Sequence, residues 1–363
     1  MKKIDRYIIY NVLITYIFIT FFLQILSIVI DISQRMHRLE NNQGSIKQAL
    51  IHYYPYWSIW LANTFSPISV FLSIIFFTSR LTKNSEMTAI LSSGISLKRI
   101  TIPYLISAFL IGGFSLIMNY SFLPMANKIK NKFHYQYLLS LSQKSKYENS
   151  KAISTQISNN EYLFIRNFSK KENIGHGFTY QKLNGNKLVY ILKAKNIFWS
   201  KKYRIYILHD YIETYIKKNK DILFKGIYIK KNFSMTPEEL LPEEYIAETM
   251  TISELKKFIN IEKNKRCHNI NRHLNEYYQR TSLPFSTFIF TILGLSISSK
   301  IKKGGIGINL IIGLILAFFY IFFIEISKVY STKEYFPSYL SVWLPNIIMG
   351  VITLFIYWNR NKN

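Results

Sequence analysis

The chain has 363 residues, of which 49% are hydrophobic and 16% aromatic, and its formal net charge is +26. A basic balance of this size is typical of proteins that bind nucleic acid or an anionic membrane surface, but apolar runs of membrane length exclude a soluble nucleic-acid-binding protein. Cys267 is the single cysteine, which excludes an intramolecular disulfide and a metal site built on paired cysteines.

Six stretches lack Asp, Glu, Lys and Arg, and each can supply the roughly 20 residues that a helix needs to cross a membrane. The first follows a basic start like that of a signal peptide, but it continues to Ile30 without a small-residue cleavage site, which indicates an uncleaved span. A polar block separates the third stretch from the fourth. We therefore predict an α-helical polytopic membrane protein with an inserted domain. The six stretches are 7–30, 48–79, 100–127, 281–299, 304–324 and 335–359.

The distribution of cations predicts the orientation of these spans. Six crossings place both termini on one side, where the short loops hold twelve Lys and Arg residues, whereas the short loops on the other side hold five. Short cytoplasmic loops are enriched in Lys and Arg. We expect both termini in the cytoplasm and the large inserted domain outside it.

A short helix is predicted between the second and third spans, within residues 82–97. In "SRLTKNSEMTAILSSGIS", Ser85 and Glu86 open the helix and Gly94 closes it, while three apolar side chains share one face. Glu86 can complement the positive end of the helix dipole, and the helix can lie flat on a membrane surface or dock on a partner. The apolar positions are Met87, Ile90 and Leu91.

The residues between 150 and 235 follow the alternating pattern of β-strands. Five runs are rich in Ile, Tyr, Phe and Val, and turn residues separate them. Asn184-Gly185 predicts a hairpin with a type I′ turn, because both central residues of that turn need positive φ. The pattern indicates an all-β sandwich or a partly open barrel. The runs are "EYLFIRNF", "GFTYQKL", "KLVYILKA", "RIYILHDYIETYI" and "ILFKGIYIKKNF".

A connecting helix is expected over 251–280, leading into the fourth span. Cys267, His268 and His273 lie in it, and we interpret them as solvated side chains and not as a metal site. The predicted domains are thus three spans over 1–127, the β domain over 128–250, the connecting helix over 251–280 and three spans over 281–363.

The sequence lacks the motifs of an enzyme. It has no GxxxxGK[ST] phosphate loop, HExxH or GxSxG. Glu325 is taken as the one acid beside a span and is expected to pair with Lys328. Asn119 and Asn309, in or near spans, are expected to hydrogen-bond between helices.

The order of these features resembles the YjgP/YjgQ permeases, the F and G membrane subunits of the Lpt lipopolysaccharide exporter. The resemblance extends across essentially the whole chain. It is carried by the start "IDRYI", the loop described above, the external β domain, "YYQRTSLPFSTFIFTILGLSIS" and the late "YLSVWLPNIIMG". The start and the end lean towards the G type, but the paralogue stays open.

The resemblance implies a permease subunit of an ATP-driven exporter in the bacterial inner membrane. It implies a heterodimer with a paralogous permease, a separate cytoplasmic ATPase dimer that binds ATP, and a periplasmic bridge of jellyroll proteins that accepts lipopolysaccharide. This chain would need no cofactor of its own. The β domain would be jellyroll-like, and the loop helix would be the coupling helix that docks on the ATPase, with Glu86 as its acidic residue.

Arg35 and Arg38 follow the first span on the external side, where cations are disfavoured, and arginine binds phosphate in bidentate fashion. The resemblance implies that basic residues in this region contact lipopolysaccharide phosphates; the alternative is that both side chains reach ordinary lipid headgroups. Two other functions are weighed for the chain: a stand-alone lipid flippase or transporter, which would need a charged residue buried in the spans, and a structural scaffold of the envelope.

Overall fold

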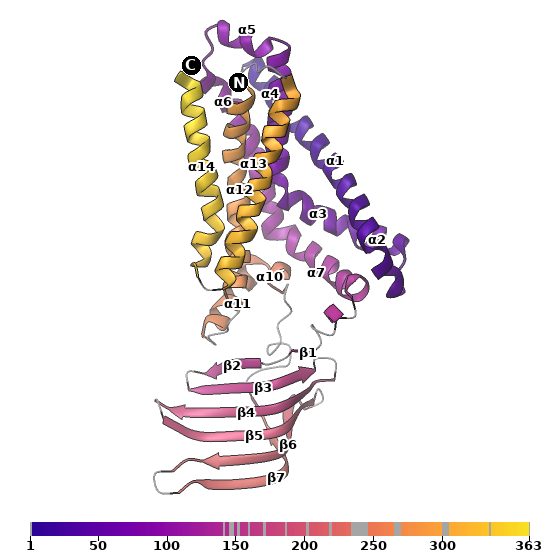
Figure 1. The fold of residues 1–363 in the computed structure, drawn as a ribbon, viewed down its shortest axis with the longest axis vertical. Coiled ribbons are helices and arrows are strands. Elements are labelled where there is room, and N and C mark those ends of the chain that lie inside the picture. The colour runs from indigo at the N-terminus through magenta and orange to yellow at the C-terminus, as the bar shows by residue number, and fades with distance from the viewer. Residues whose placement is uncertain are drawn as a thin grey trace. The chain divides into compact units, whose positions relative to one another are not determined.

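The computed structural model shows two compact units (Figure 1). The helical unit comprises 1–137, 247–253 and 271–363, and the β unit comprises 138–246 and 254–270. The residues that the structure describes are 2–140, 142–144, 149–150, 153–158, 160–169, 172–185, 187–200, 203–217, 220–233, 246–264, 270–299, 305–333 and 335–362.

Helices account for the helical unit, and two of its segments are π-helical. The helices of the first half are α1 (Lys3–Asn41), α2 (Ile46–His52), α3 (Tyr54–Thr64), α4 (Ser66–Lys83), α5 (Glu86–Ser92), α6 (Leu97–Ile117), the π-helix η1 (Met118–Phe122), α7 (Leu123–Phe133) and the π-helix η2 (His134–Leu138). Those of the second half are α10 (Ile246–Thr249), α12 (Ile270–Ser298), α13 (Gly305–Thr332) and α14 (Ser338–Lys362). The helix α11 (Ile252–Asn264) belongs mostly to the β unit.

Within the described residues, five helices are long and apolar enough to cross a membrane, and the bent pair of α3 and α4 makes six if it counts as one span. The prediction of one continuous second span over 48–79 is therefore wrong, because α3 and α4 differ in direction by 65°. Pro67 explains the break, since proline lacks an amide hydrogen and its ring clashes with the carbonyl four residues earlier.

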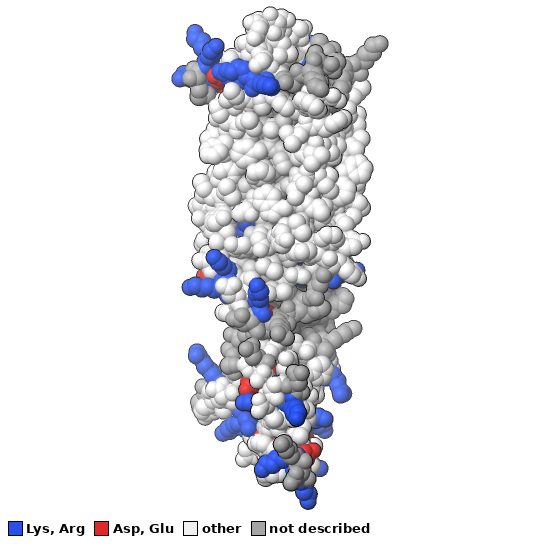
Figure 2. All heavy atoms as spheres, turned by 90° about the vertical axis from the view of Figure 1, so that its left-hand side faces the viewer, with Lys and Arg blue, Asp and Glu red and all other residues white. Residues whose placement is uncertain are grey.

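The core of the helical unit surrounds α4, which packs against both α1 and α13. Phe71, Ile74 and Ile75 of α4 are completely buried, and Phe71 contacts Phe290 of α12 with 5.0 Å between the ring centroids. On the face shown in Figure 2, Lys and Arg gather at the two ends of the helical unit, and a broad band nearly free of charged side chains lies between them. Such a band is what a hydrocarbon environment requires.

The β unit contains one antiparallel sheet of seven described strands, in the order β1-β3-β4-β5-β6-β7, with β2 also pairing with β3. All five strands predicted from the sequence are confirmed, whereas β1 and the short, polar β2 were not predicted. From β2 to β7 consecutive strands lie side by side and β1 pairs with β3, so the described strands form a meander, unlike the two Greek keys of a jellyroll. The strands are β1 (Asn149–Ser150), β2 (Ile153–Ser158), β3 (Glu161–Ser169), β4 (Ile174–Asn184), β5 (Lys187–Ser200), β6 (Ile205–Tyr215) and β7 (Ile222–Lys231).

A line of interruptions folds this sheet into two halves. The pairing skips one residue in each of β3 to β7, at 166, 177, 195, 210 and 227. Gly177 and Asp210 have φ of +69° and +51° on this line, a left-handed conformation that lies outside the β region. The ring of Phe233, after β7, lies 5.3 Å from that of Tyr180 on one side of the line and 5.7 Å from that of Tyr206 on the other. The two halves therefore enclose a common apolar interior.

The hairpin between β4 and β5 is confirmed, but its turn lies one residue later than predicted. Asn184 still pairs with Lys187 as part of the strand, and Gly185, the described residue between them, has a positive φ of +60°. Gly185 takes this left-handed conformation without steric cost, because it has no β-carbon.

Two domain limits also differ from the expected ones. The helix of the third span continues through α7 and η2, so the β unit begins at 138 and not at 128. The connecting helix expected over 251–280 consists of α11 and the first turns of α12, and Cys267 and His268 lie outside the described residues. His273 is only 3% exposed, so its prediction as a solvated side chain is wrong; it lies seven residues before the buried Arg280, on the same face of α12.

Candidate functional site

The short helix α5 lies where the sequence predicts a loop helix. Ser85, at φ +63°, precedes it, and Gly94, at φ +85°, follows its last turn. Met87 is 1% exposed and belongs to the core formed by α1, α4 and α6, against which Ile90 and Leu91 also pack. The apolar face of α5 is therefore directed towards the protein's own helices. Its outward face carries small side chains, namely Thr88, Ala89, Ser92 and Ser93.

Glu86 stands half-buried at the beginning of α5. The Tyr7 hydroxyl of α1 donates to Glu86 Oε2 at 3.3 Å, and the Asn84 amide donates to Oε1 at 3.3 Å. Both donors are neutral, so they orient the carboxylate without cancelling its charge. An oriented acid beside a row of small exposed side chains can accept a charge-assisted hydrogen bond from a docking partner.

Arg35 and Arg38 lie near the end of α1, but their surroundings differ. Arg35 Nε lies 2.8 Å from Asp31 Oδ1, and Arg35 Nη1 lies 3.1 Å from His134 Nδ1 of η2. The Tyr54 hydroxyl donates to the other oxygen of Asp31 at 3.1 Å. Arg38, three residues on, has an exposed side chain. Of the two predicted phosphate-binding residues, Arg35 thus joins α1 to η2, and Arg38 is the one open to solvent.

The prediction that Glu325 is the only acid beside a span is wrong. Asp5 and Asp31 are 5% and 8% exposed inside α1. Each forms an ion pair with an arginine. Arg99 Nη2 lies 2.7 Å from Asp5 Oδ2, and Asp31 pairs with Arg35 as described above. Glu325 pairs with Lys328 at 3.1 Å, as predicted. A buried acid with a hydrogen-bonded arginine is a structural ion pair, which does not favour a stand-alone ion-coupled transporter.

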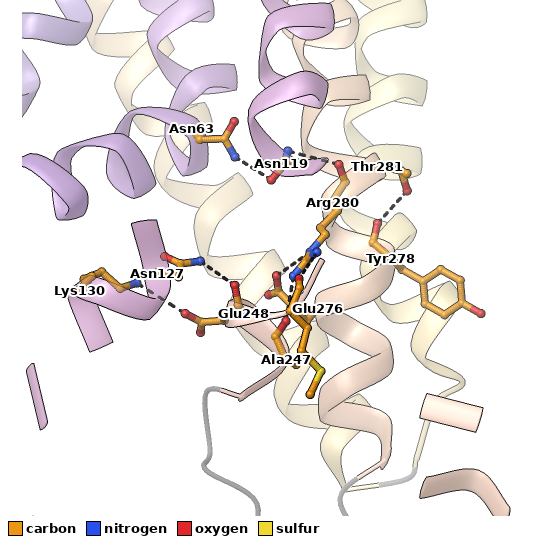
Figure 3. A network of polar contacts seen from close by, with 11 residues as sticks. Asn63, Asn119, Asn127, Lys130, Ala247, Glu248, Glu276, Tyr278, Arg280 and Thr281 are labelled. Atoms are coloured by element: carbon orange, nitrogen blue, oxygen red, sulfur yellow. Dashed lines mark hydrogen bonds and ion pairs between the residues drawn. The ribbon is translucent and has the colours of Figure 1, made fainter. Parts of the chain in front are cut away.

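A buried polar cluster, which we call the asparagine node, joins three membrane helices (Figure 3). The Asn63 amide of α3 donates to Asn119 Oδ1 of η1 at 2.9 Å, and the Ser115 hydroxyl donates to Asn63 Oδ1 at 2.7 Å. The Asn119 amide donates to the carbonyl of Arg280 in α12 at 3.3 Å. That carbonyl lacks its usual helical donor, because residue 284 is proline. The predicted role of Asn119 between helices is confirmed, as is that of Asn309, which donates to Ser79 Oγ at 2.9 Å.

The segment Ala247–Met250, here called the return segment, re-enters the helical unit after the β unit. Arg280 of α12 donates to the carbonyls of Met250 and Ala247, both at 2.8 Å. From α7, the Asn127 amide donates to the Glu248 carbonyl at 3.1 Å (Figure 3). Two membrane helices therefore hold the backbone of this segment.

A charge cluster surrounds the same segment. Lys130 of α7 is 7% exposed; its Nζ lies 3.5 Å from Glu248 Oε2 and 4.3 Å from the ring centroid of Trp60. Glu276 pairs with Arg280 at 3.2 Å. Burial, and then the neighbouring Glu276 carboxylate, raise the pKa of Glu248, and the Lys130 ammonium opposes that shift. The return segment is thus fixed by charge as well as by backbone hydrogen bonds.

Sequence reasoning did not find this cluster. Lys130 follows the third charge-free run and Arg280 directly precedes the fourth, so both resemble ordinary flanking cations. Pro284, four residues after Arg280, was the available signal, because it predicts an unpaired carbonyl that a neighbouring amide must satisfy.

Comparison with known proteins gives one family. The model of a family described as "Lipopolysaccharide export system permease LptF/LptG" matches residues 6–359. No curated protein matches the chain significantly.

Proposed function

Because the chain belongs to the lipopolysaccharide export system permease LptF/LptG family, we propose that it draws lipopolysaccharide from the outer leaflet of the inner membrane and passes it to a periplasmic bridge, using ATP hydrolysed by a separate subunit. The observation that carries the proposal is the family match over nearly the whole chain, spans and inserted β unit together. The sequence has no phosphate loop, which agrees with energy supplied by another chain.

The position and packing of α5 support a docking role on the cytoplasmic side. Its apolar face is occupied by the protein's own core, so the helix does not need a membrane surface to cover that face. Its small outward side chains let another protein approach the backbone closely. In this proposal Glu86 gives the docking contact its charge, and Met87, Ile90 and Leu91 hold the helix in place.

Copurification tests the central claim. The full-length chain, solubilised from its own host in mild detergent, should bring down a paralogous permease and an ATPase in fixed ratio, and ATPase activity should rise with added lipopolysaccharide. A chain that is always recovered without an ATPase would exclude the exporter. Unchanged lipopolysaccharide export after depletion would instead favour an envelope scaffold.

For lipopolysaccharide phosphates, we propose Arg38 as the residue in contact and Arg35 as its structural neighbour. Arg38→Gln should weaken stimulation of the ATPase by lipopolysaccharide several-fold without changing the thermal stability of the complex. Arg35→Gln should lower stability, because Asp31 would lose its hydrogen-bonded cation. Equal stimulation in the Arg38→Gln variant and the unmodified protein, measured with purified lipopolysaccharide, would refute the assignment.

The β unit offers a route for acyl chains and an edge for a partner. We expect acyl chains between the two halves of the sheet, so photo-crosslinkers at 188, 190 and 192 should label lipid and those at 189, 191 and 193 should not. Among the described strands, β7 pairs only with β6 and exposes Leu223 and Ile227. A strand edge of this kind binds another strand through backbone hydrogen bonds, and crosslinkers along β7 should capture a jellyroll protein of the bridge.

A further inference from the structure

The helix α1 is built differently from the other long helices that the structure describes. Its 39 residues contain neither proline nor glycine, whereas α6, α12 and α14 each contain an internal proline and α13 contains glycines. Sharp bends in long helices occur at such residues. From Asp5 to Arg38, α1 is therefore one unbroken helix about 50 Å long, given the rise of an α-helix.

Burial along α1 is confined to its two ends. Ile8 and Val12 are 1% and 0% exposed near its beginning, and Asp31 and Leu39 are 8% and 4% exposed near its end. No residue of α1 between Val12 and Asp31 is buried. In Figure 1, α1 begins beside α5 at one end of the helical unit and ends beside α2. The rest of the protein therefore holds this helix at two separate places.

The beginning of α1 is fixed to α5. Ile8 and Val12 share a core with Met87 of α5. On the polar side, the Tyr7 hydroxyl donates to Glu86 as described above. A displacement of α5 would therefore act directly on the first turns of α1.

An ion pair fixes the same end of α1 to α6. Arg99 Nη2 lies 2.7 Å from Asp5 Oδ2, and the backbone amide of Lys2 donates to the same oxygen at 2.9 Å. Asp5 is 5% exposed, and among the described side chains only Arg99 hydrogen-bonds it. Arg99 lies in the first turn of α6, the helix that follows α5. Both helices that flank the short loop after α5 are thus attached to the beginning of α1.

The other end of α1 has contacts of its own. Arg35 meets His134 of η2 as described above. The Asn42 side chain, directly after α1, donates to the Tyr137 carbonyl of η2 at 3.0 Å. The exposed Arg38 lies between these two contacts in the sequence. Its position therefore depends on where the end of α1 stands against η2.

We propose that α1 is a lever that transmits a displacement of α5 to Arg38, and that Asp5 and Arg99 are the positioning residues that hold its beginning in place. A rigid helix held at its ends can couple two distant sites. Without Arg99, Asp5 would stay buried without its cation, which weakens the attachment. Only the identity of the protein that moves α5, the ATPase, rests on the proposed function.

The first test measures this link in the full-length chain alone, in phosphatidylcholine nanodiscs. In a Cys267→Ser background, spin labels are placed at Glu40→Cys and Tyr339→Cys, both exposed positions. Double electron–electron resonance then reports the distance between the end of α1 and the beginning of α14. A change at the beginning of α1 can alter this distance only through the helix or its neighbours.

The variants separate these two routes. Arg99→Gln should shift or broaden the distance distribution, and the exchanged pair Asp5→Arg with Arg99→Asp should restore it. Lys98→Gln is the matched control, because it removes the same charge one residue earlier from an exposed side chain. The control should leave the distribution unchanged.

The second test uses the complex with the ATPase. Arg99→Gln should leave the Kd of the ATPase unchanged, because Glu86 still forms the docking contact, but should reduce stimulation of the ATPase by lipopolysaccharide several-fold. The exchanged pair should recover the stimulation. A residue with a merely structural role would instead lower affinity, stimulation and thermal stability together.

Three outcomes would overturn the proposal. An identical distance distribution in Arg99→Gln and the unmodified chain would show that α1 does not link its two ends. An equal change in Lys98→Gln would trace the effect to surface charge, and a change that the exchanged pair does not reverse would show that Arg99 acts apart from Asp5. The distance measurement involves neither ATPase nor lipopolysaccharide, so its failure leaves the exporter itself untouched, and a failed copurification leaves the link along α1 intact.

Discussion

Prolines and asparagines act together in the helical unit. Pro67 separates α3 from α4, Pro124 is the second residue of α7 just after the π-helix η1, and Pro284 leaves the Arg280 carbonyl without a donor from its own helix. The asparagine node lies among these three irregularities and satisfies that carbonyl through Asn119. In a membrane, a broken backbone hydrogen bond has no water to replace it. The side-chain amides are therefore part of the backbone bonding scheme.

This relation predicts non-additive mutations. Asn119→Ala should lower the free energy of unfolding by roughly 0.6–2 kcal/mol, because it leaves the Arg280 carbonyl without a hydrogen-bond donor and removes the interhelical hydrogen bond to Asn63. In a Pro284→Ala background the loss should be smaller, since the new amide hydrogen of residue 284 can bond that carbonyl. Unfolding by SDS titration in mixed micelles measures both.

Asn309→Ala is the control for this cycle, because Asn309 bonds only the Ser79 side chain in the described residues and no proline-freed carbonyl. Its effect should add to that of Pro284→Ala. Equal losses for Asn119→Ala in both backgrounds would show that the carbonyl contact has no energetic weight.

Substitutions of Glu86 can separate its charge from its hydrogen bonds. Glu86→Gln keeps an oxygen for Tyr7 or Asn84 but removes the charge, and Glu86→Lys reverses it. If the charge binds the ATPase, the Kd should rise in both variants and most in Glu86→Lys, where a charged contact at an interface is worth about 2–5 kcal/mol.

Affinity of the ATPase for the purified permease, measured by biolayer interferometry, decides between the two roles of Glu86. Glu325→Gln is the control, because Glu325 is an exposed acid on α13. If the Glu86→Lys variant bound the ATPase with unchanged affinity, Glu86 would only complement the dipole at the beginning of α5.

At the level of elements, alternation and apolar length were sufficient to predict the five long strands and the run of membrane helices. They failed where a contact distant in sequence decides the local geometry. Pro67 marks the 65° bend at α3–α4, but the hydrogen bond between Asn63 and Asn119 of the π-helix η1 joins residues 56 positions apart, which no local pattern contains. The site residues divide in the same way. Glu86 and Gly94 follow from capping rules, whereas the burial of Met87 and the pairing of Arg35 depend on tertiary packing.

The fold line of the sheet provides a test at this scale. Gly177 has φ +69°, and a β-carbon there would lie 3.0 Å from the Cβ of Arg166. Gly177→Ala should therefore cost more than the roughly 1–2 kcal/mol of a left-handed alanine. Gly185→Ala is the control, because its φ is +60° with nothing within 4 Å of the added carbon.

Proteolysis rates of the β unit in the full-length protein, across a urea series, compare the two variants. Gly177→Ala should expose the unit at lower urea than Gly185→Ala. Identical midpoints would show that Arg166 moves aside freely and that crowding does not define the fold line.

For the molecule as a whole, labelling of single cysteines tests the predicted orientation across the membrane. The chain has a single cysteine, so Cys267→Ser gives a cysteine-free background. Ser92→Cys on α5 and Glu172→Cys in the β unit are both exposed positions. With a membrane-impermeant maleimide on cells whose outer membrane is permeabilised, Glu172→Cys should react at once and Ser92→Cys only after the inner membrane is opened. The reverse pattern would invert the predicted orientation.

The charge cluster around the return segment has a consequence for how the protein is made. Asn127 and Glu248 are 121 positions apart, and residues 138–246, the larger part of the β unit, are synthesised between them. While the ribosome translates that stretch, Lys130 has the ring of Trp60 beside it but lacks the Glu248 carboxylate. The first membrane half therefore waits in an incomplete state until residue 248 arrives. A premature stop within the β unit should yield a fragment that membrane quality-control proteases remove, whereas a later stop after Glu248 should yield a longer-lived one.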